Sequence, residues 1–111
     1  MIATVTPPEL ARLVHAETVD LIDVREPHEW DTGHIPGARL VPLETFRADP
    51  EKYLVRGAKT VFICARGVRS MAAAKLADRF GYDQLINLEG GTKEWIALGL
   101  EVVVPGARVA A

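Results

Sequence analysis

The chain has 111 residues, 49% of them hydrophobic and 25% charged, which is typical of one globular domain with a core of its own. A formal net charge of −2 gives no general attraction to nucleic acid or to an anionic membrane surface. A single cysteine excludes the internal disulfide framework of a small secreted scaffold.

Short apolar runs alternate with helical patterns along the chain. We predict strands at residues 3–5, 19–24, 38–41, 60–64 and 85–88, and a last extended piece at 102–104. We predict helices at residues 7–15, 27–31, 43–48, 50–55, 70–80 and 91–98, and Thr6 and Glu9 form a capping box before the first. This alternation predicts an α/β fold in which helices cover both faces of a mainly parallel sheet.

Linkers, repeats, targeting signals and metal-ligand clusters are all missing from the pattern. We therefore expect one domain over residues 1–111, with a core at about 4–104 and a loose tail at 105–111. The first residues, MIATV, lack the basic and apolar regions of a signal peptide, so we expect a cytoplasmic protein with a reduced thiol. The cysteine and the three histidines are scattered, and we expect no metal site.

Cys64 stands where chemistry is expected in such a fold. It ends the apolar run Thr60–Ile63 and precedes a short loop and a helix. In parallel sheets, ligands bind at the carboxyl ends of the strands. Backbone N–H groups and a helix N-terminus at that edge favour an anion and lower the pKa of a thiol. A lone cysteine is more often a buried hydrophobic residue, and the loop that follows favours the reactive interpretation.

The six residues from Cys64 to Arg69 form the predicted active-site loop. Gly67 permits a positive φ, so that consecutive N–H groups can curl into a concave anion site. Arg66 and Arg69 add two cations that could hold an anion. The alternative role for Arg66 is that of a solvated surface residue, and the alternative role for Arg69 is a structural salt bridge. We predict Cys64 as the nucleophile, and as substrate-binding residues Ala65, Arg66, Gly67, Val68 and Arg69.

Three segments resemble the signatures of the rhodanese (thiosulfate sulfurtransferase) superfamily. They are DVREPHEW at 23–30 with GHIPGA at 33–38, CARGVRS at 64–70, and LEGGTKEW at 88–95 with Gly99 after it. They stand in the family's order and span nearly the whole chain. The resemblance implies a rhodanese-like three-layer domain with a central, mainly parallel five-stranded sheet flanked by helices. Among the members of the superfamily, the chain resembles the stand-alone single-domain proteins, whose active site is open.

The resemblance also implies the reaction of a thiosulfate sulfurtransferase. Sulfane sulfur would move from thiosulfate or an organic persulfide to Cys64, and from this persulfide to cyanide in assays or to a thiol in cells. Loop N–H groups would stabilise the negative persulfide, and no metal or organic cofactor is required. The expected partners are these small molecules and a persulfide-donating protein, with no nucleic acid and no membrane.

The other signature residues are expected to support the loop. Asp23 and Arg25 lie at the end of their strand, on the same rim as Cys64, and should fix loops by hydrogen bonds and charge pairing. Ser70 follows the loop and is a further supporting residue. The histidine at the position of His34 belongs to a structural turn in the rhodanese superfamily, so we do not expect His34 to act as a base.

Two alternative functions remain open at this stage. Phosphatases of the same fold have a loop one residue longer, C-x5-R, whereas Cys64 and Arg69 define C-x4-R. Mercaptopyruvate sulfurtransferases favour small neutral loop residues, so the two arginines here favour an anionic donor such as thiosulfate. A sulfur-carrier or regulatory module would also keep Cys64, and the sequence does not separate it from an enzyme that turns over.

Overall fold

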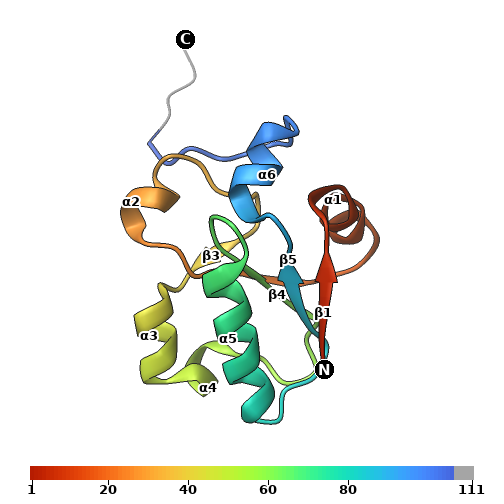
Figure 1. Cartoon of the computed structure of the whole chain (residues 1–111), viewed down its shortest axis with the longest axis vertical. Coiled ribbons are helices and arrows are strands. Elements are labelled where there is room, and N and C mark those ends of the chain that lie inside the picture. Colours follow the sequence, from red (N-terminus) through yellow and green to blue (C-terminus); the bar gives the residue numbers. More distant parts are fainter. Residues whose placement is uncertain (107–111) are drawn as a thin grey trace.

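A parallel sheet forms the centre of the molecule in the computed structural model, which describes residues 1–106 (Figure 1). The strands are β1 (Ile2–Val5), β2 (Asp20–Asp23), β3 (Arg39–Leu40), β4 (Thr60–Ile63) and β5 (Leu85–Leu88). They are all parallel and lie in the order β1-β5-β4-β2-β3. The predicted α/β fold with a five-stranded, mainly parallel sheet is confirmed.

Helices form a layer on each face of this sheet. The helices are α1 (Pro7–Ala16), α2 (Pro27–Trp30), α3 (Leu43–Ala48), α4 (Pro50–Tyr53), α5 (Val68–Arg79) and α6 (Gly91–Ala97). One core cluster joins the sheet to α3, α4 and α5, and a second joins it to α1 and α6. Among the described residues, no helix is both long and apolar enough to cross a membrane.

The central strand β4 is buried on both faces, as two covering layers require. Val61 and Ile63 belong to the cluster with α1 and α6, whereas Phe62 and Cys64 belong to the cluster with α3 and α5. Fully burying a side chain such as Phe62 contributes about 1.5–3 kcal/mol. The alternation carries Cys64 to the carboxyl edge of the sheet, on the side where α5 begins.

Local sequence explains why two helices start where they do. Thr6 and Glu9 form the predicted capping box, since the Glu9 carboxylate accepts from the Thr6 N–H at 2.9 Å and the Thr6 hydroxyl accepts from the Glu9 N–H at 3.4 Å. Helix α5 begins at Val68, two residues before its predicted start. Gly67 has a φ of +95° and reverses the chain at once, so Val68 and Arg69 form the first turn rather than a loop.

The structure adds detail to the predicted extended piece at 102–104 and to the end of α4. The extended piece at 102–104 does not join the sheet: Val103 pairs with His34 in an isolated antiparallel bridge, with N···O distances of 2.9 and 2.8 Å. Helix α4 ends at Tyr53, because Leu54 has an extended backbone and a buried side chain. In the predicted loose tail, residues 107–111 lie outside the described residues.

Candidate active site

Cys64 follows β4 directly and lies at the floor of a small pocket. Its exposed fraction is 1%, and the pocket has a volume of about 230 Å³. The lining residues are Cys64, Ala65, Arg66, Val68 and Arg69. The predicted nucleophile and four of the five predicted substrate-binding residues therefore meet at one place.

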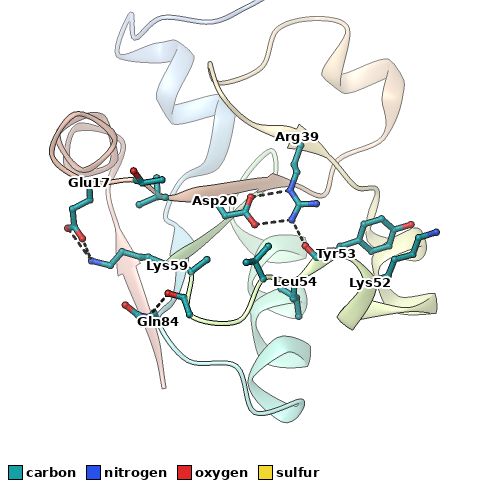
Figure 2. A pocket seen from close by; sticks show the side chains of 13 residues that line it. Glu17, Asp20, Arg39, Lys52, Tyr53, Leu54, Lys59 and Gln84 are labelled. Carbon is teal, nitrogen blue, oxygen red and sulfur yellow. Dashed lines mark hydrogen bonds and ion pairs between the residues drawn. The ribbon is translucent and has the colours of Figure 1, made fainter.

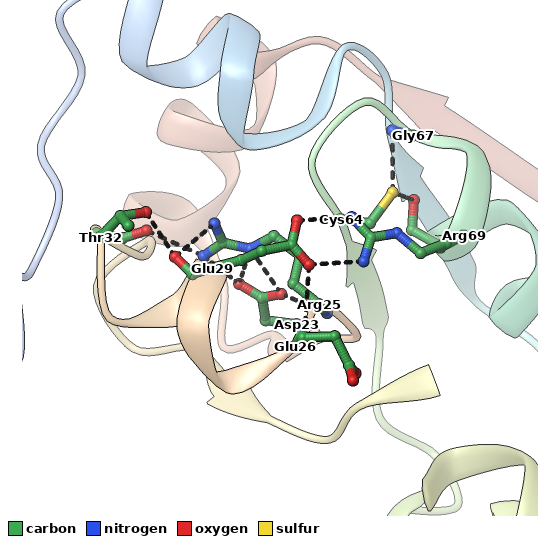
Figure 3. Close-up of polar contacts among 10 residues, drawn as sticks. Asp23, Arg25, Glu26, Glu29, Thr32, Cys64, Gly67 and Arg69 are labelled. Atoms are coloured by element: carbon green, nitrogen blue, oxygen red, sulfur yellow. Dashed lines mark hydrogen bonds and ion pairs between the residues drawn. The ribbon is translucent and has the colours of Figure 1, made fainter. Parts of the chain in front are cut away.

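The Cys64 sulfur accepts a hydrogen bond from the loop and shares another with a hydroxyl in the first turn of α5 (Figure 3). The Gly67 N–H donates to Sγ at 3.0 Å, and the Ser70 hydroxyl lies 3.2 Å from Sγ. Burial raises the pKa of the Cys64 thiol, but hydrogen bonds from the Ser70 side chain and from backbone N–H groups of the loop outweigh it, and the pKa lies below its ordinary value. The arrangement favours a thiolate.

Ser70 is shared between the sulfur and Asn87 of β5. Its hydroxyl lies 2.5 Å from Asn87 Oδ1, and Asn87 Nδ2 donates to the Gly67 carbonyl at 3.2 Å. A serine hydroxyl carries one proton, so Ser70 donates either to Asn87 or to the thiolate. Sequence reasoning missed Asn87, whose signal is a polar residue within the buried run Leu85–Leu88.

Arg69 points to the pocket but is held by Glu29 of α2 (Figure 3). The two guanidinium nitrogens lie 2.7 and 2.8 Å from the two carboxylate oxygens, in a forked pair. The hydrogen bond from Arg69 holds the pKa of Glu29 at about 2. This is the salt-bridge alternative for Arg69, and it largely neutralises the cation; a contact of Arg69 with substrate stays a prediction. Glu29 was missed as a functional residue, although it lies within the segment 23–30.

Asp23 and Arg25 form a buried ion pair that supports α2. Arg25 Nη2 lies 2.9 Å from Asp23 Oδ2 and also donates to the Gly33 carbonyl at 3.0 Å, and Nη1 donates to the Glu29 carbonyl at 3.2 Å. The exposed fractions of Asp23 and Arg25 are 0% and 3%. The pair ties the end of β2 to the helix that carries Glu29, as expected of residues that fix loops. Neither side chain lines the Cys64 pocket.

Helix α6 holds the loop from the other side. The N–H groups of Thr92 and Lys93 donate to the carbonyls of Cys64 and Ala65 at 2.9 and 3.0 Å. A Cβ atom on Gly91 would lie 2.3 Å from the Cys64 carbonyl oxygen, so only glycine fits there. The pair Gly90–Gly91 does open a helix, as predicted, but its close approach to the loop was missed.

Arg66 and Val68 form the mouth of the pocket. Both are exposed, and the exposed fraction of Val68 is 77%. Within residues 1–106, no carboxylate forms an ion pair with Arg66, in contrast to Arg69. Its charge is therefore available to an anion that enters the pocket.

A larger hollow, of about 690 Å³, lies at the opposite, amino end of the strands (Figure 2). Four of its five charged side chains are paired with each other, since Lys59 lies 2.9 Å from Glu17 and Arg39 lies 2.9 Å from Asp20. It contains no thiol or histidine. Size alone does not make it a site, and the Cys64 pocket remains the candidate active site.

His34 and the tryptophans have packing roles. The His34 ring stacks on Trp30 with a centroid distance of 3.4 Å and an interplanar angle of 6°. Trp95 is buried, and its Nε1 donates to the Glu101 carbonyl at 2.8 Å. His34 does not line the Cys64 pocket.

Comparison with known proteins agrees with the motifs and the fold. The family model described as the rhodanese-like domain matches residues 6–98. The chain belongs to the rhodanese family. This rhodanese is 32% identical to a rhodanese-related protein from Thermoplasma volcanium of known structure, with a TM-score of 0.83, and the match covers 92% of this chain and 98% of that one. The predicted resemblance is confirmed.

Curated relatives support a transferase of the rhodanese family. The thiosulfate:glutathione sulfurtransferase of Homo sapiens is 33% identical over 106 residues, covering 84% of this chain and 92% of that protein. The uncharacterised protein YqhL of Bacillus subtilis is 43% identical over 76 residues, covering 68% of this chain and 59% of YqhL. The probable adenylyltransferase/sulfurtransferase MoeZ of Mycobacterium tuberculosis is 36% identical over 95 residues. The chain spans 24% of the length of MoeZ.

Proposed function

We propose that this rhodanese transfers sulfane sulfur through a persulfide on Cys64. The observation that carries the proposal is a buried sulfur that accepts a hydrogen bond from the Gly67 N–H and whose pKa is lowered. In the first step the thiolate attacks the outer sulfur of the donor. A new S–S bond forms on Cys64, and the S–S bond of the donor breaks. The leaving group is sulfite when the donor is thiosulfate, and a thiol when the donor is an organic persulfide.

In the second step an acceptor nucleophile attacks the outer sulfur of the Cys64 persulfide. The S–S bond to Cys64 breaks, and its electron pair returns the sulfur to the thiolate. A lowered pKa makes this thiolate a better leaving group, so the same hydrogen bonds serve both steps. Neither step needs an electron carrier or a metal. The chemistry needs a free thiol, which fits a reducing compartment such as the cytoplasm.

The donor we propose is a small anion, with thiosulfate as the first candidate. Arg66 carries the free charge at the mouth, and the pocket volume of about 230 Å³ suits a compact donor. The name of the human relative, thiosulfate:glutathione sulfurtransferase, suggests a small thiol as the acceptor for this chain too. A persulfide-donating protein is a further proposed partner.

Phosphatase activity is the less favoured alternative. Phosphoryl transfer over a cysteine needs a wider ring of N–H donors and an arginine free to clamp the phosphate. Here the loop is C-x4-R, and Arg69 is held by Glu29 at 2.7 Å. The native protein should therefore hydrolyse aryl phosphates no faster than a Cys64→Ser control.

Steady-state kinetics test the proposal and separate an enzyme from a sulfur carrier. With thiosulfate as donor and glutathione or cyanide as acceptor, we expect sulfite release on every turnover and the parallel-line pattern of a two-step mechanism. Cys64→Ser should release none. A single burst of sulfite, stoichiometric with the protein and without turnover, would contradict the enzyme and favour the carrier.

A further inference from the structure

A second hollow with basic walls lies on the same side of the sheet as the Cys64 pocket. Its volume is about 460 Å³, and Figure 1 shows α3 and α5, which border it, side by side. Ala72 and Leu76 are half-buried and form an apolar floor, whereas the cationic residues are exposed. We call its lining residues the basic groove: Arg47, Ala72, Lys75, Leu76 and Arg79.

One face of α5 connects the basic groove with the pocket of Cys64. Val68, Ala72, Lys75 and Arg79 recur at helical spacing and so lie on one stripe, and Val68 also lines the Cys64 pocket. The opposite stripe is buried against the sheet: Ser70, Ala73, Ala74 and Ala77. Val68 and Arg79 are about 16 Å apart along the helix, which about five residues of extended peptide can span.

Two of the three cations of the basic groove form no ion pair with the described part of the chain, and the third forms a weak one. In residues 1–106, Lys75 and Arg79 form no ion pair, and Arg47 pairs only with Glu44 at 3.1 Å, with both side chains at least half exposed. An exposed pair of this kind is weak and easily exchanged. Because the whole chain has a net charge of −2, this concentration of cations is local to one face. It complements a partner that carries carboxylates.

From this placement we propose that the basic groove docks an acidic segment of a protein whose cysteine exchanges sulfur with Cys64. The proposal rests on the proposed function. The partner's thiolate attacks the outer sulfur of the Cys64 persulfide, a new persulfide forms on the partner, and Cys64 leaves as the thiolate. Electrons and atoms balance without a further reagent, and the reverse exchange loads Cys64. The apolar floor at Ala72 and Leu76 suits a peptide side chain better than a phosphodiester backbone.

Matched cysteine peptides test the docking. One carries glutamates at about three to six residues from its cysteine, the distance that reaches the basic groove, and its counterpart carries glutamines. Each is made with the charged run before or after the cysteine. With persulfidated protein at low salt, we expect kcat/KM for the better glutamate peptide to exceed that of its glutamine counterpart by about tenfold, and salt should erase the difference.

Charge-reversal variants locate the effect. Lys75→Glu and Arg79→Glu should each remove most of the preference for glutamate and create one for a lysine peptide. The matched control is Arg12→Glu, which makes the same change of charge at an exposed site on α1, across the sheet. This variant should keep the preference. All variants should transfer sulfur to dithiothreitol, which is uncharged, at the native rate.

Three results would overturn the docking proposal. One is equal transfer to glutamate and glutamine peptides, with normal transfer to dithiothreitol. Another is an equal loss of preference in Arg12→Glu. The third is stronger inhibition by a single-stranded oligonucleotide than by a cysteine-free glutamate peptide, which would assign the groove to nucleic acid. No transfer from the native protein even to dithiothreitol would instead contradict the proposed function, and the docking with it.

Discussion

At the scale of single residues, hydrogen bonds rather than charged neighbours lower the pKa of Cys64. The sulfur lies 3.0 Å from the Gly67 N–H and 3.2 Å from the Ser70 hydroxyl, whereas the nearby Arg69 is paired with Glu29. The sequence placed two arginines near the thiol and could not say which of them is free. That difference follows from Glu29, a residue 40 positions away in the chain.

Ser70→Ala tests the hydrogen-bond account directly. Since the hydroxyl stabilises the thiolate, its removal should raise the pKa of Cys64, and the native pKa should lie below the free-thiol value of about 8.5. The rate of alkylation against pH gives both midpoints, because only the thiolate reacts. An unchanged midpoint in Ser70→Ala would mean that the Ser70 hydroxyl donates its hydrogen bond to Asn87 and does not stabilise the thiolate.

Arg25→Leu tests the buried pair behind the site. The Asp23 carboxylate would remain buried without a partner, so we expect a loss of about 3–5 kcal/mol in the free energy of unfolding. Arg39→Leu is the matched control, because its pair with Asp20 is partly exposed and should contribute no more than about 1 kcal/mol. Urea unfolding measures both. An equal loss of unfolding free energy in the two variants would contradict the claim that the buried pair stabilises the fold more than the partly exposed pair does.

At the scale of elements, three neighbours hold the loop after β4 in place. Strand β5 supplies Asn87, α6 supplies the N–H groups of Thr92 and Lys93, and α2 supplies Glu29 for Arg69. All of these contacts lie within the protein itself. We therefore expect the N–H donors to be fixed where the proposed persulfide would carry negative charge, so that little reorganisation is needed during the reaction.

The link between α2 and α5 should respond to acid. The pKa of Glu29 is lowered from 4.5 to about 2 by Arg69, so the pair stabilises the fold above about pH 4.5 and the contribution disappears as the pH falls towards 2. Glu29→Gln should be less stable than the native protein at neutral pH, and the difference should shrink across this window. Urea unfolding at several pH values measures it. A difference that does not depend on pH would contradict the assignment.

Local sequence signals predicted most elements but not all of their ends. Capping residues, apolar runs and helix-ending glycines depend on neighbours in the chain, and the capping box at Thr6 and Glu9 was predicted correctly. The start of α5 was predicted too late, because Gly67 was expected within the loop, whereas its left-handed conformation places it directly before the first helical residue. The piece at 102–104 is extended at Val103, but its partner could not be predicted, because it is His34, far away in the chain.

At the scale of the whole molecule, the sequence predicted the fold class but not the strand order. Alternating strands and helices indicate a parallel sheet, whereas the order β1-β5-β4-β2-β3 depends on long-range pairing. The order places β4 between β2 and β5, so the strands that carry Asp23 and Asn87 flank the strand that leads to Cys64. Only that arrangement shows what Glu29 and Gly91 contact, whereas Asn87 had a local signal as a polar residue within a buried strand.

The central claim is that Cys64 carries the transferred sulfur, and intact-mass measurement tests it most directly. After incubation with thiosulfate, the native protein should gain the mass of one sulfur atom, and a reductant should remove it. Cys64→Ser should gain nothing, while Ser70→Ala, which keeps the thiol, should still be loaded at a pH above its raised pKa. A gain of sulfur on Cys64→Ser, or no gain on the native protein, would contradict the account.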